Sequence, residues 1–240
     1  MQQPGLRTVA IKSEEQQAVL AQHRMRAQLV KFRTAQINSL RGLLAEYGEV
    51  MPQGRSGIRR GIAEALERIS ERLPAMVIET LREQWTRVAE LEAQVGEIER
   101  RLRQWHRSSE ASQRIAEIPG VGVLGATAAI ATMGDPGVFR SGREFAAWLG
   151  LVPRHRGTAG RVLLLGISKR GDTYLRTLLI HGARLVLIGS KAPPEWAVLV
   201  AARRPLNVAV VALANKIART IWAVLAHDRA YRDDYASSLA

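Results

Sequence analysis

Apolar residues recur at helical spacing along the first part of the chain. Between Ser13 and Gly48 they keep to one helical face, at Val19, Met25, Leu29, Val30, Ile37, Leu40 and Leu44. Ser13 and Gln16 have the spacing of a capping box, in which each side chain accepts a hydrogen bond from the backbone N–H of the other residue. The pattern therefore predicts one long helix that begins after Ser13 and ends near Gly48.

Two more helices are predicted before residue 108. A segment with Gly and Pro, residues 48–57, precedes a second helix over Ile58–Leu73, and Pro74 suits the first position of a third. Apolar residues of the third helix are three and four positions apart, at Leu81, Trp85, Val88, Leu91, Val95, Ile98, Leu102 and Trp105. A spacing of about 3.5 residues is typical of a coiled-coil seam, although an ordinary bundle helix also fits. We expect this helix to pack antiparallel on the first, or on the same helix of a second subunit.

A group of shorter helices follows a predicted hinge at Ser108–Ser112. The segment Ile115–Gly122 leads into an apolar helical run, Val123–Met133, and the two together resemble a helix-hairpin-helix. In that motif Gly120 and Gly122 would let backbone amides approach a phosphate at the start of the following helix. A plain turn between two helices with a Gly cap is the alternative interpretation.

The segment from Leu149 to Arg176 carries the strongest chemical signal. It predicts a short apolar strand, a loop rich in Gly and Arg, and a basic turn before a helix from about Gly171 to Ile188. Such a loop can bring backbone N–H groups and guanidinium groups against phosphates. The candidate binding residues are Arg154, Arg156, Arg161, Lys169, Arg170 and Arg176.

Together these elements predict a mainly α fold with at most a short β element. A second capping box, Ser141–Glu144, predicts a short helix, and a final helix is expected over Leu206–Ala226. We expect a flexible segment over residues 1–12, a helical arm with coiled-coil character over residues 13–107, a compact helical domain over residues 112–228 and a flexible tail over residues 229–240.

Composition and charge narrow the classes of function. The 240 residues include 35 Lys and Arg against 22 Asp and Glu, a formal net charge of +13. A polyanion, above all nucleic acid, is the expected partner, although genome composition can also favour Arg over Lys. The chain has no Cys and only five scattered His, so we expect neither disulfides nor a metal site.

Membrane segments are not expected either. No apolar stretch of signal-peptide length follows Met1, and apolar runs such as Val208–Ala214 are too short to cross a bilayer. We therefore expect a soluble cytoplasmic protein.

Ordered strings across the second half resemble the C-terminal domain of the bridge-RNA-guided insertion-sequence transposases, relatives of the pilin-gene invertases. The strings are Ile118–Gly122, Gly134–Pro136, Phe139–Glu144, Trp148–Arg154, Gly166–Asp172, Tyr174–Ala183 and Ala212–Lys216. The first half resembles the coiled-coil segment of that family. Several strings in the same order are far more specific than any one alone.

The resemblance implies DNA transposition by site-specific recombination, guided by a structured RNA. In the family, Asp-Glu-Asp-Asp carboxylates of an N-terminal domain would hold Mg²⁺, and a Ser of the C-terminal domain attacks the phosphodiester. Because Met1 falls just before the coiled-coil segment, we expect a truncated transposase without the acidic domain and without a cofactor of its own. Gly157 stands where the family has its nucleophilic Ser, which leaves Thr158 as the candidate hydroxyl, while Ser168 is expected to cap the following helix.

These observations predict a chain that binds DNA and guide RNA and that self-associates or joins a full-length relative, but that does not cleave DNA alone. Three alternatives remain open. The chain could be a non-catalytic regulator of its full-length relatives, a helix-hairpin-helix accessory in DNA repair, or a decayed fragment.

Overall fold

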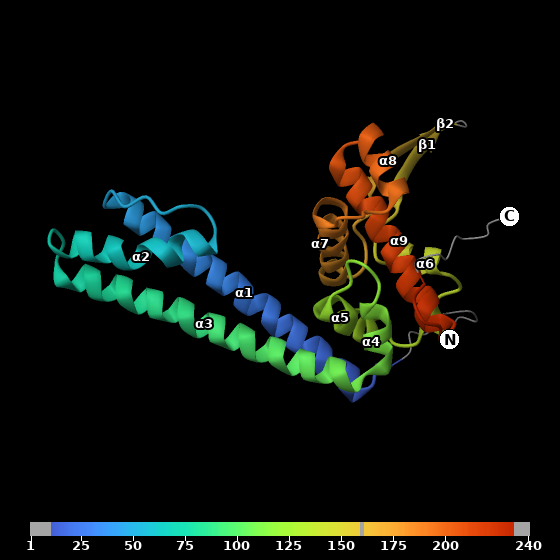
Figure 1. Ribbon diagram of the computed structural model, residues 1–240, viewed down its shortest axis with the longest axis horizontal. Helices are drawn as coiled ribbons and strands as arrows, with labels where there is room; N and C mark the ends of the chain where they lie inside the picture. Colours follow the sequence, from blue (N-terminus) through green and yellow to red (C-terminus); the bar gives the residue numbers. More distant parts are fainter. Residues whose placement is uncertain (1–10, 159–160, 233–240) are drawn as a thin grey trace, which may run out of the picture. The chain divides into compact units, whose positions relative to one another are not determined.

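A computed structural model describes residues 11–158 and 161–232 (Figure 1). Its elements, in chain order, are α1 (Glu14–Glu46), α2 (Arg55–Ser70), α3 (Ala75–Ser108), α4 (Glu110–Ala116), α5 (Val123–Met133), the 3-10 turn η1 (Pro136–Val138), α6 (Gly142–Trp148), β1 (Pro153–Thr158), β2 (Arg161–Ile167), α7 (Thr173–Gly189), α8 (Glu195–Arg203) and α9 (Leu206–Ala226). The structure confirms the expected mainly α fold with one short β element. The flexible ends predicted over residues 1–12 and 229–240 lie for the most part outside the described residues.

Packing divides the chain into two compact units. The helical-arm unit comprises Ala21–Arg101. The C-terminal unit comprises the start of α1 up to Leu20 and everything from Leu102 onward.

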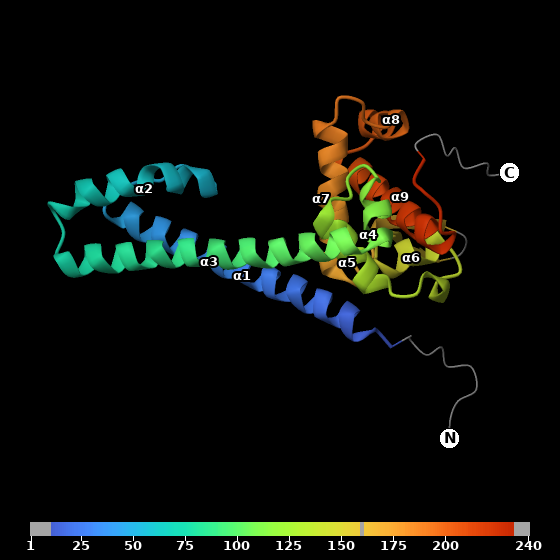
Figure 2. The same ribbon diagram turned by 60° about the horizontal axis from the view of Figure 1, so that its bottom comes forward.

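In the helical-arm unit α1 and α3 run antiparallel and α2 packs against both (Figure 2). Arg26 Nε donates to Glu99 Oε1 at 2.8 Å. Further along, Gln36 Nε2 donates to Gln84 Oε1 at 2.7 Å, so the two helices progress in opposite directions. The core of this unit is formed by Ile37, Leu40, Leu44, Ile58, Ile62, Leu66, Ile69, Ile78, Leu81 and Val88. The third helix thus packs antiparallel on the first within one chain, as expected.

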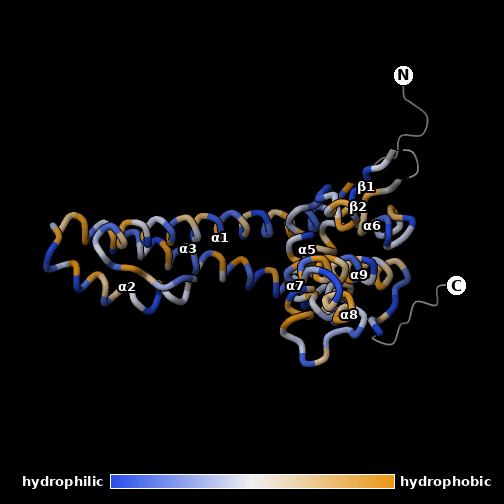
Figure 3. The backbone as a smooth tube through the Cα atoms, turned by 90° about the horizontal axis from the view of Figure 1, so that it is seen from above, coloured by the Kyte–Doolittle hydropathy of each residue, from blue (hydrophilic) through white to orange (hydrophobic). Residues whose placement is uncertain are grey.

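The apolar pattern of α3 accounts for this packing. Of its eight regularly spaced apolar residues, six are buried, and Trp85 and Trp105 are partly buried. Figure 3 shows hydrophobic positions alternating with hydrophilic ones along α1, α2 and α3. Burial of the apolar stripe removes it from water and leaves the charged face exposed.

The predicted capping box at the start of α1 is confirmed. Ser13 N donates to Gln16 Oε1 at 3.0 Å, and Gln16 N donates to Ser13 Oγ at 3.1 Å. These bonds satisfy two backbone donors that have no partner inside the helix.

In the C-terminal unit α9 packs against α4, α6, α7 and α8. The fully buried Phe145 of α6 belongs to its core, and α5 packs on α4 and α7. The buried residues of α9 are Ala209, Val210, Leu213, Ala214, Ile217, Ala218, Ile221 and Val224. Alanine at three of these eight positions lets neighbouring helices approach α9 closely.

By length and composition alone, α9 would suffice to cross a membrane. The whole helix Leu206–Ala226 is longer than the uncharged run Val208–Ala214, on which the expectation of no membrane segment rests. In the structure the apolar face of α9 lines the core of the C-terminal unit.

Candidate nucleic-acid interface

The Gly- and Arg-rich segment forms a β-hairpin, which corrects the prediction of a short apolar strand followed by a loop. Leu149 is the C-cap of α6, and Gly150 then takes a positive φ of 73°. Strand β1 begins only at Pro153 and pairs antiparallel with β2. The sequence of β1, Pro-Arg-His-Arg-Gly-Thr, lacks apolar alternation, so its strand character comes from pairing with β2 rather than from local pattern.

Two backbone hydrogen bonds close the base of the hairpin. Ser168 N donates to Val152 O at 2.9 Å, and Lys169 N donates to Gly150 O at 3.2 Å. We call residues 148–152 and 168–171 the hairpin base. These bonds tie the end of α6 to the basic turn that precedes α7.

Two glycines allow the two segments of the hairpin base to cross in close contact. A Cβ on Gly150 would clash with Arg170 O, and one on Gly171 would clash with Trp148 O. Both residues also have positive φ, at 73° and 69°. Only glycine accommodates both the contact and the dihedral angle without strain.

Arg176 lies inside the unit, which corrects its assignment as a phosphate-binding residue. It is only 6% exposed. Its Nη1 donates to Leu149 O at 2.9 Å and to Arg170 O at 2.7 Å, and its Nη2 donates to Thr173 Oγ1 at 3.1 Å. The guanidinium therefore joins both segments of the hairpin base and cannot reach a ligand at the surface.

Four of the predicted cations are exposed around the hairpin and its base. Arg154 and Arg156 lie on β1, and Lys169 and Arg170 form the basic turn. Lys169 has a φ of 56°, an unusual value for a residue with a side chain, and its N–H donates to Gly150 O. Arg161 and Thr158 pair at the end of the hairpin, but their side chains lie outside what the structure describes. Gly157 faces Val162 across the strands.

Asp172, not Ser168, caps α7. Asp172 Oδ1 accepts from Leu175 N at 2.9 Å. Ser168 Oγ is buried and has no hydrogen-bond partner, so the predicted cap at this position is wrong. The cap belongs to the residue directly before the first helical turn, which is the position whose side chain reaches the free amides.

The turn between α4 and α5 uses its two glycines differently. Gly120 has a φ of 88°, and its carbonyl lies so close to Gly182 of α7 that a Cβ on Gly182 could not fit. Gly122 is exposed and is the N-cap of α5, with no side-chain cap. Gly120 therefore serves packing on α7, whereas Gly122 is exposed at the N-terminus of α5.

Asn215 and Lys216 of α9 were not among the predicted site residues. Asn215 Nδ2 donates to Leu151 O at 3.3 Å, just before β1. Lys216 is exposed, with Nζ 5.0 Å from the centre of the Trp196 ring. In the sequence, these two residues are marked only by the string Ala212–Lys216, which is one of the strings that resemble the transposase family. That string does not indicate that α9 supports the hairpin.

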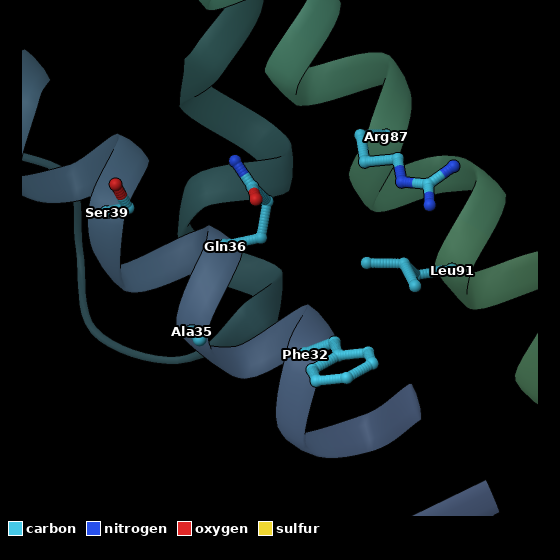
Figure 4. A pocket seen from close by; sticks show the side chains of 6 residues that line it. All are labelled: Phe32, Ala35, Gln36, Ser39, Arg87 and Leu91. Carbon is cyan, nitrogen blue, oxygen red and sulfur yellow. The ribbon is translucent and has the colours of Figure 1, made fainter. Parts of the chain in front are cut away.

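Elsewhere the described residues offer little chemistry. No group of three or more His, Asp or Glu among them is arranged to hold a metal ion. A shallow hollow of 380 Å³ lies between α1 and α3, lined by Phe32, Ala35, Gln36, Ser39, Arg87 and Leu91 (Figure 4). Its one ionisable side chain, Arg87, pairs with Glu90 at 2.7 Å. This hollow has no feature of a catalytic site.

Comparison with known proteins agrees with the resemblance carried by the second half. The family model described as "Transposase IS116/IS110/IS902 family" matches residues 112–200, which run from within α4 to within α8 and include the hairpin. The "Probable family 20 transposase" of Pseudomonas aeruginosa is 45% identical over 234 residues, which cover 95% of this chain and 69% of that protein.

Two further relatives are transposases of named insertion sequences. That of element IS1111A from Coxiella burnetii is 40% identical over 232 residues, 95% of this chain and 64% of the relative. That of element IS1328 from Yersinia enterocolitica is 37% identical over 225 residues, 92% of this chain and 66% of the relative. The chain thus spans about two thirds of the length of these relatives. On these matches the chain belongs to the IS116/IS110/IS902 family of transposases.

Proposed function

We propose that this chain binds DNA during transposition of an insertion sequence by site-specific recombination. The observation that supports this most is the hairpin itself. Arg154, Arg156, Lys169 and Arg170 are exposed on a hairpin and turn whose base is held by the buried Arg176. A hydrogen-bonded base with exposed cationic side chains suits phosphates, because the backbone is already ordered before binding and less entropy is lost.

Further partners follow from the family resemblance. We propose a structured guide RNA and a second copy or a longer relative as partners, all in the cytoplasm. The exposed Gly122 leaves the N-terminus of α5 available to a phosphate, as the helix-hairpin-helix interpretation requires. The antiparallel pair α1 and α3 is an element of the kind through which helical proteins associate.

The described residues do not fit the Mg²⁺ that the resemblance implies. They provide no group of three or more carboxylate or imidazole side chains within reach of one ion. The hydroxyl chemistry is equally incomplete, since Gly157 of β1 has no side chain at the position of the family's nucleophile. What this chain's own residues supply is binding and positioning of the nucleic acid.

Salt dependence tests the binding proposal. Purified protein is titrated into a fluorescein-labelled DNA duplex at several salt concentrations, with anisotropy as the readout. If Lys169 and Arg170 each neutralise a phosphate, the slope of log K against the logarithm of the salt concentration becomes less negative by about 2 in the variant Lys169→Gln/Arg170→Gln. The control is Arg59→Gln/Arg60→Gln on α2, where two cations are also exposed. Absence of binding by the unmodified protein contradicts the proposal.

Covalent capture tests the chemistry. We expect no covalent adduct between this chain and a radiolabelled DNA substrate in the presence of Mg²⁺, because Gly157 has no hydroxyl. An adduct that survives denaturing electrophoresis and disappears in Thr158→Ala would show that Thr158 acts as the nucleophile, and would overturn this expectation.

A further inference from the structure

The hairpin carries one face on which cationic and apolar side chains lie together. Arg156 pairs directly with Leu163, so their side chains share a face of the ribbon. Arg154 and Leu165 each lie two positions away along their own strands, at the register shift between Pro153 and His155, where a bulge interrupts the regular pairing. We call Arg154, Arg156, Leu163 and Leu165 the mixed face.

The mixed face is open to solvent. Both arginines are exposed, and Leu163 and Leu165 are 61% and 39% exposed. Figure 1 shows the two strands extending beyond the helices of their own unit. A two-stranded hairpin gains little stability in water by itself, and exposed leucines add none. A ribbon of this composition, fixed only at its base, is suited to a ligand that offers negative charge and apolar contact side by side.

We propose that the mixed face enters the major groove of duplex DNA. This inference rests on the proposed function and names the ligand of the same site. The major groove is about 12 Å wide and admits a two-stranded β-ribbon, whereas the minor groove, about 6 Å wide, does not without deformation. The groove also provides both kinds of contact. Phosphates and guanine O6 and N7 accept hydrogen bonds from Arg154 and Arg156, and the thymine methyl group contacts Leu163 and Leu165.

The same geometry excludes duplex RNA as the ligand of this face. In an A-form helix the major groove is deep and narrow, so side chains cannot read it, and RNA lacks the thymine methyl group. A guide RNA would therefore bind elsewhere on the protein. The hairpin distinguishes DNA from RNA by groove width rather than by charge, which the two polymers share.

The experiment compares three probes of one mixed sequence of about 30 base pairs: duplex DNA, duplex RNA and duplex DNA with uracil in place of thymine. Binding is followed by fluorescence anisotropy. Unmodified protein is expected to bind duplex DNA about tenfold more tightly than duplex RNA, with the uracil duplex in between. Methyl green, which occupies the major groove, should displace the protein, and netropsin, which occupies the minor groove, should not.

Two variants and their controls assign the effect to the mixed face. Arg154→Gln/Arg156→Gln is expected to weaken DNA binding about tenfold and RNA binding far less. Leu163→Ser/Leu165→Ser should abolish the difference between thymine and uracil duplexes. The controls are Arg59→Gln/Arg60→Gln on α2 and Leu185→Ser/Ile188→Ser on α7, which alter equally exposed residues outside the hairpin. Hydrogen exchange of the peptide that covers residues 153–167 shows whether each hairpin variant keeps the backbone hydrogen bonds between β1 and β2.

The outcomes separate this inference from the proposed function. If the unmodified protein binds no nucleic acid, both fail. If it binds DNA but the arginine variant binds as tightly, or if RNA binds equally well, or if netropsin is the effective competitor, the groove assignment is wrong and the proposed function stands.

Discussion

Arg176 carries a charge inside the C-terminal unit, and its position explains how that is tolerated. A buried guanidinium is costly unless its donors are paired. Here two carbonyl oxygens, of Leu149 and Arg170, and the hydroxyl of Thr173 accept from it. The two carbonyls belong to the two segments of the hairpin base, so one side chain holds both segments in place.

Replacement of Arg176 should therefore destabilise the protein and loosen the hairpin. Arg176→Met fills much of the volume but leaves the buried carbonyl of Leu149 and the partly buried carbonyl of Arg170 without this donor, so we expect a loss of about 2 kcal/mol in the free energy of unfolding in urea. The exposed Arg204→Met should change it by less than about 0.5 kcal/mol. Equal effects of the two substitutions would show that the network around Arg176 adds no stability.

Glycines in helices provide a second residue-scale test, because two of them have opposite surroundings. In α7, a Cβ on Gly182 would clash with the carbonyl of Gly120, whereas nothing lies within 4 Å of a Cβ on Gly96 in α3. Gly182→Ala should lower the free energy of unfolding by about 2 kcal/mol through overpacking. Gly96→Ala should raise it by about 0.5 to 1 kcal/mol, because alanine favours the helix. A stabilising Gly182→Ala would contradict the close crossing of the α4–α5 turn over α7.

Among the elements, the long helices were predictable, whereas α8 and the hairpin were not predicted. The capping boxes at Ser13 and Ser141 depend on residues three positions apart. Ser13 and Gln16 form both reciprocal bonds. Ser141 Oγ accepts from Glu144 N, whereas Glu144 Oε2 accepts from Arg140 N, one residue before the predicted donor. The hairpin depends on pairing between β1 and β2, which local propensity in β1 does not favour. For the same reason the exposed cations of the candidate site could be predicted from residue type, but the burial of Arg176 and the support from Asn215 could not.

The junction between α3 and α4 should respond to pH. Burial lowers the pKa of His106 below its ordinary value of 6.5, and its Nδ1 lies 2.8 Å from Ser112 Oγ. A lowered pKa in the folded state means that the unfolded chain takes up the proton first. Stability from the neutral ring is thus complete above pH 6.5 and is lost as pH falls through the folded pKa.

Urea unfolding between about pH 7.5 and 5.5 measures this effect. We expect His106→Gln to lose less stability over that interval than the unmodified protein. The difference should be a fraction of 1 kcal/mol, because the ring is only partly buried and solvent screens its charge. Identical pH profiles for the two proteins would show that His106 does not contribute.

For the whole molecule, the distribution of charge separates the two units. Ala21–Arg101 contains 14 Lys and Arg against 11 Asp and Glu, a net +3, which leaves +10 of the chain's +13 for the C-terminal unit. In the helical arm many cations are paired, as in Arg26 with Glu99 and Arg68 with Glu49, both at 2.7 Å. Net charge alone predicted a nucleic-acid partner, but only the fold shows which unit carries the excess.

Hydrogen exchange with and without duplex DNA should therefore protect one unit selectively. We expect slower exchange in peptides covering residues 150–176, where the hairpin and the basic turn lie, and little change over residues 21–101. The physical reason is that local potential, rather than total charge, concentrates a polyanion at a surface. Protection should decline as salt rises, because phosphate contacts release counterions. If protection is centred on α1, α2 and α3 instead, the arm binds DNA, and the hairpin needs another explanation for its exposed cations.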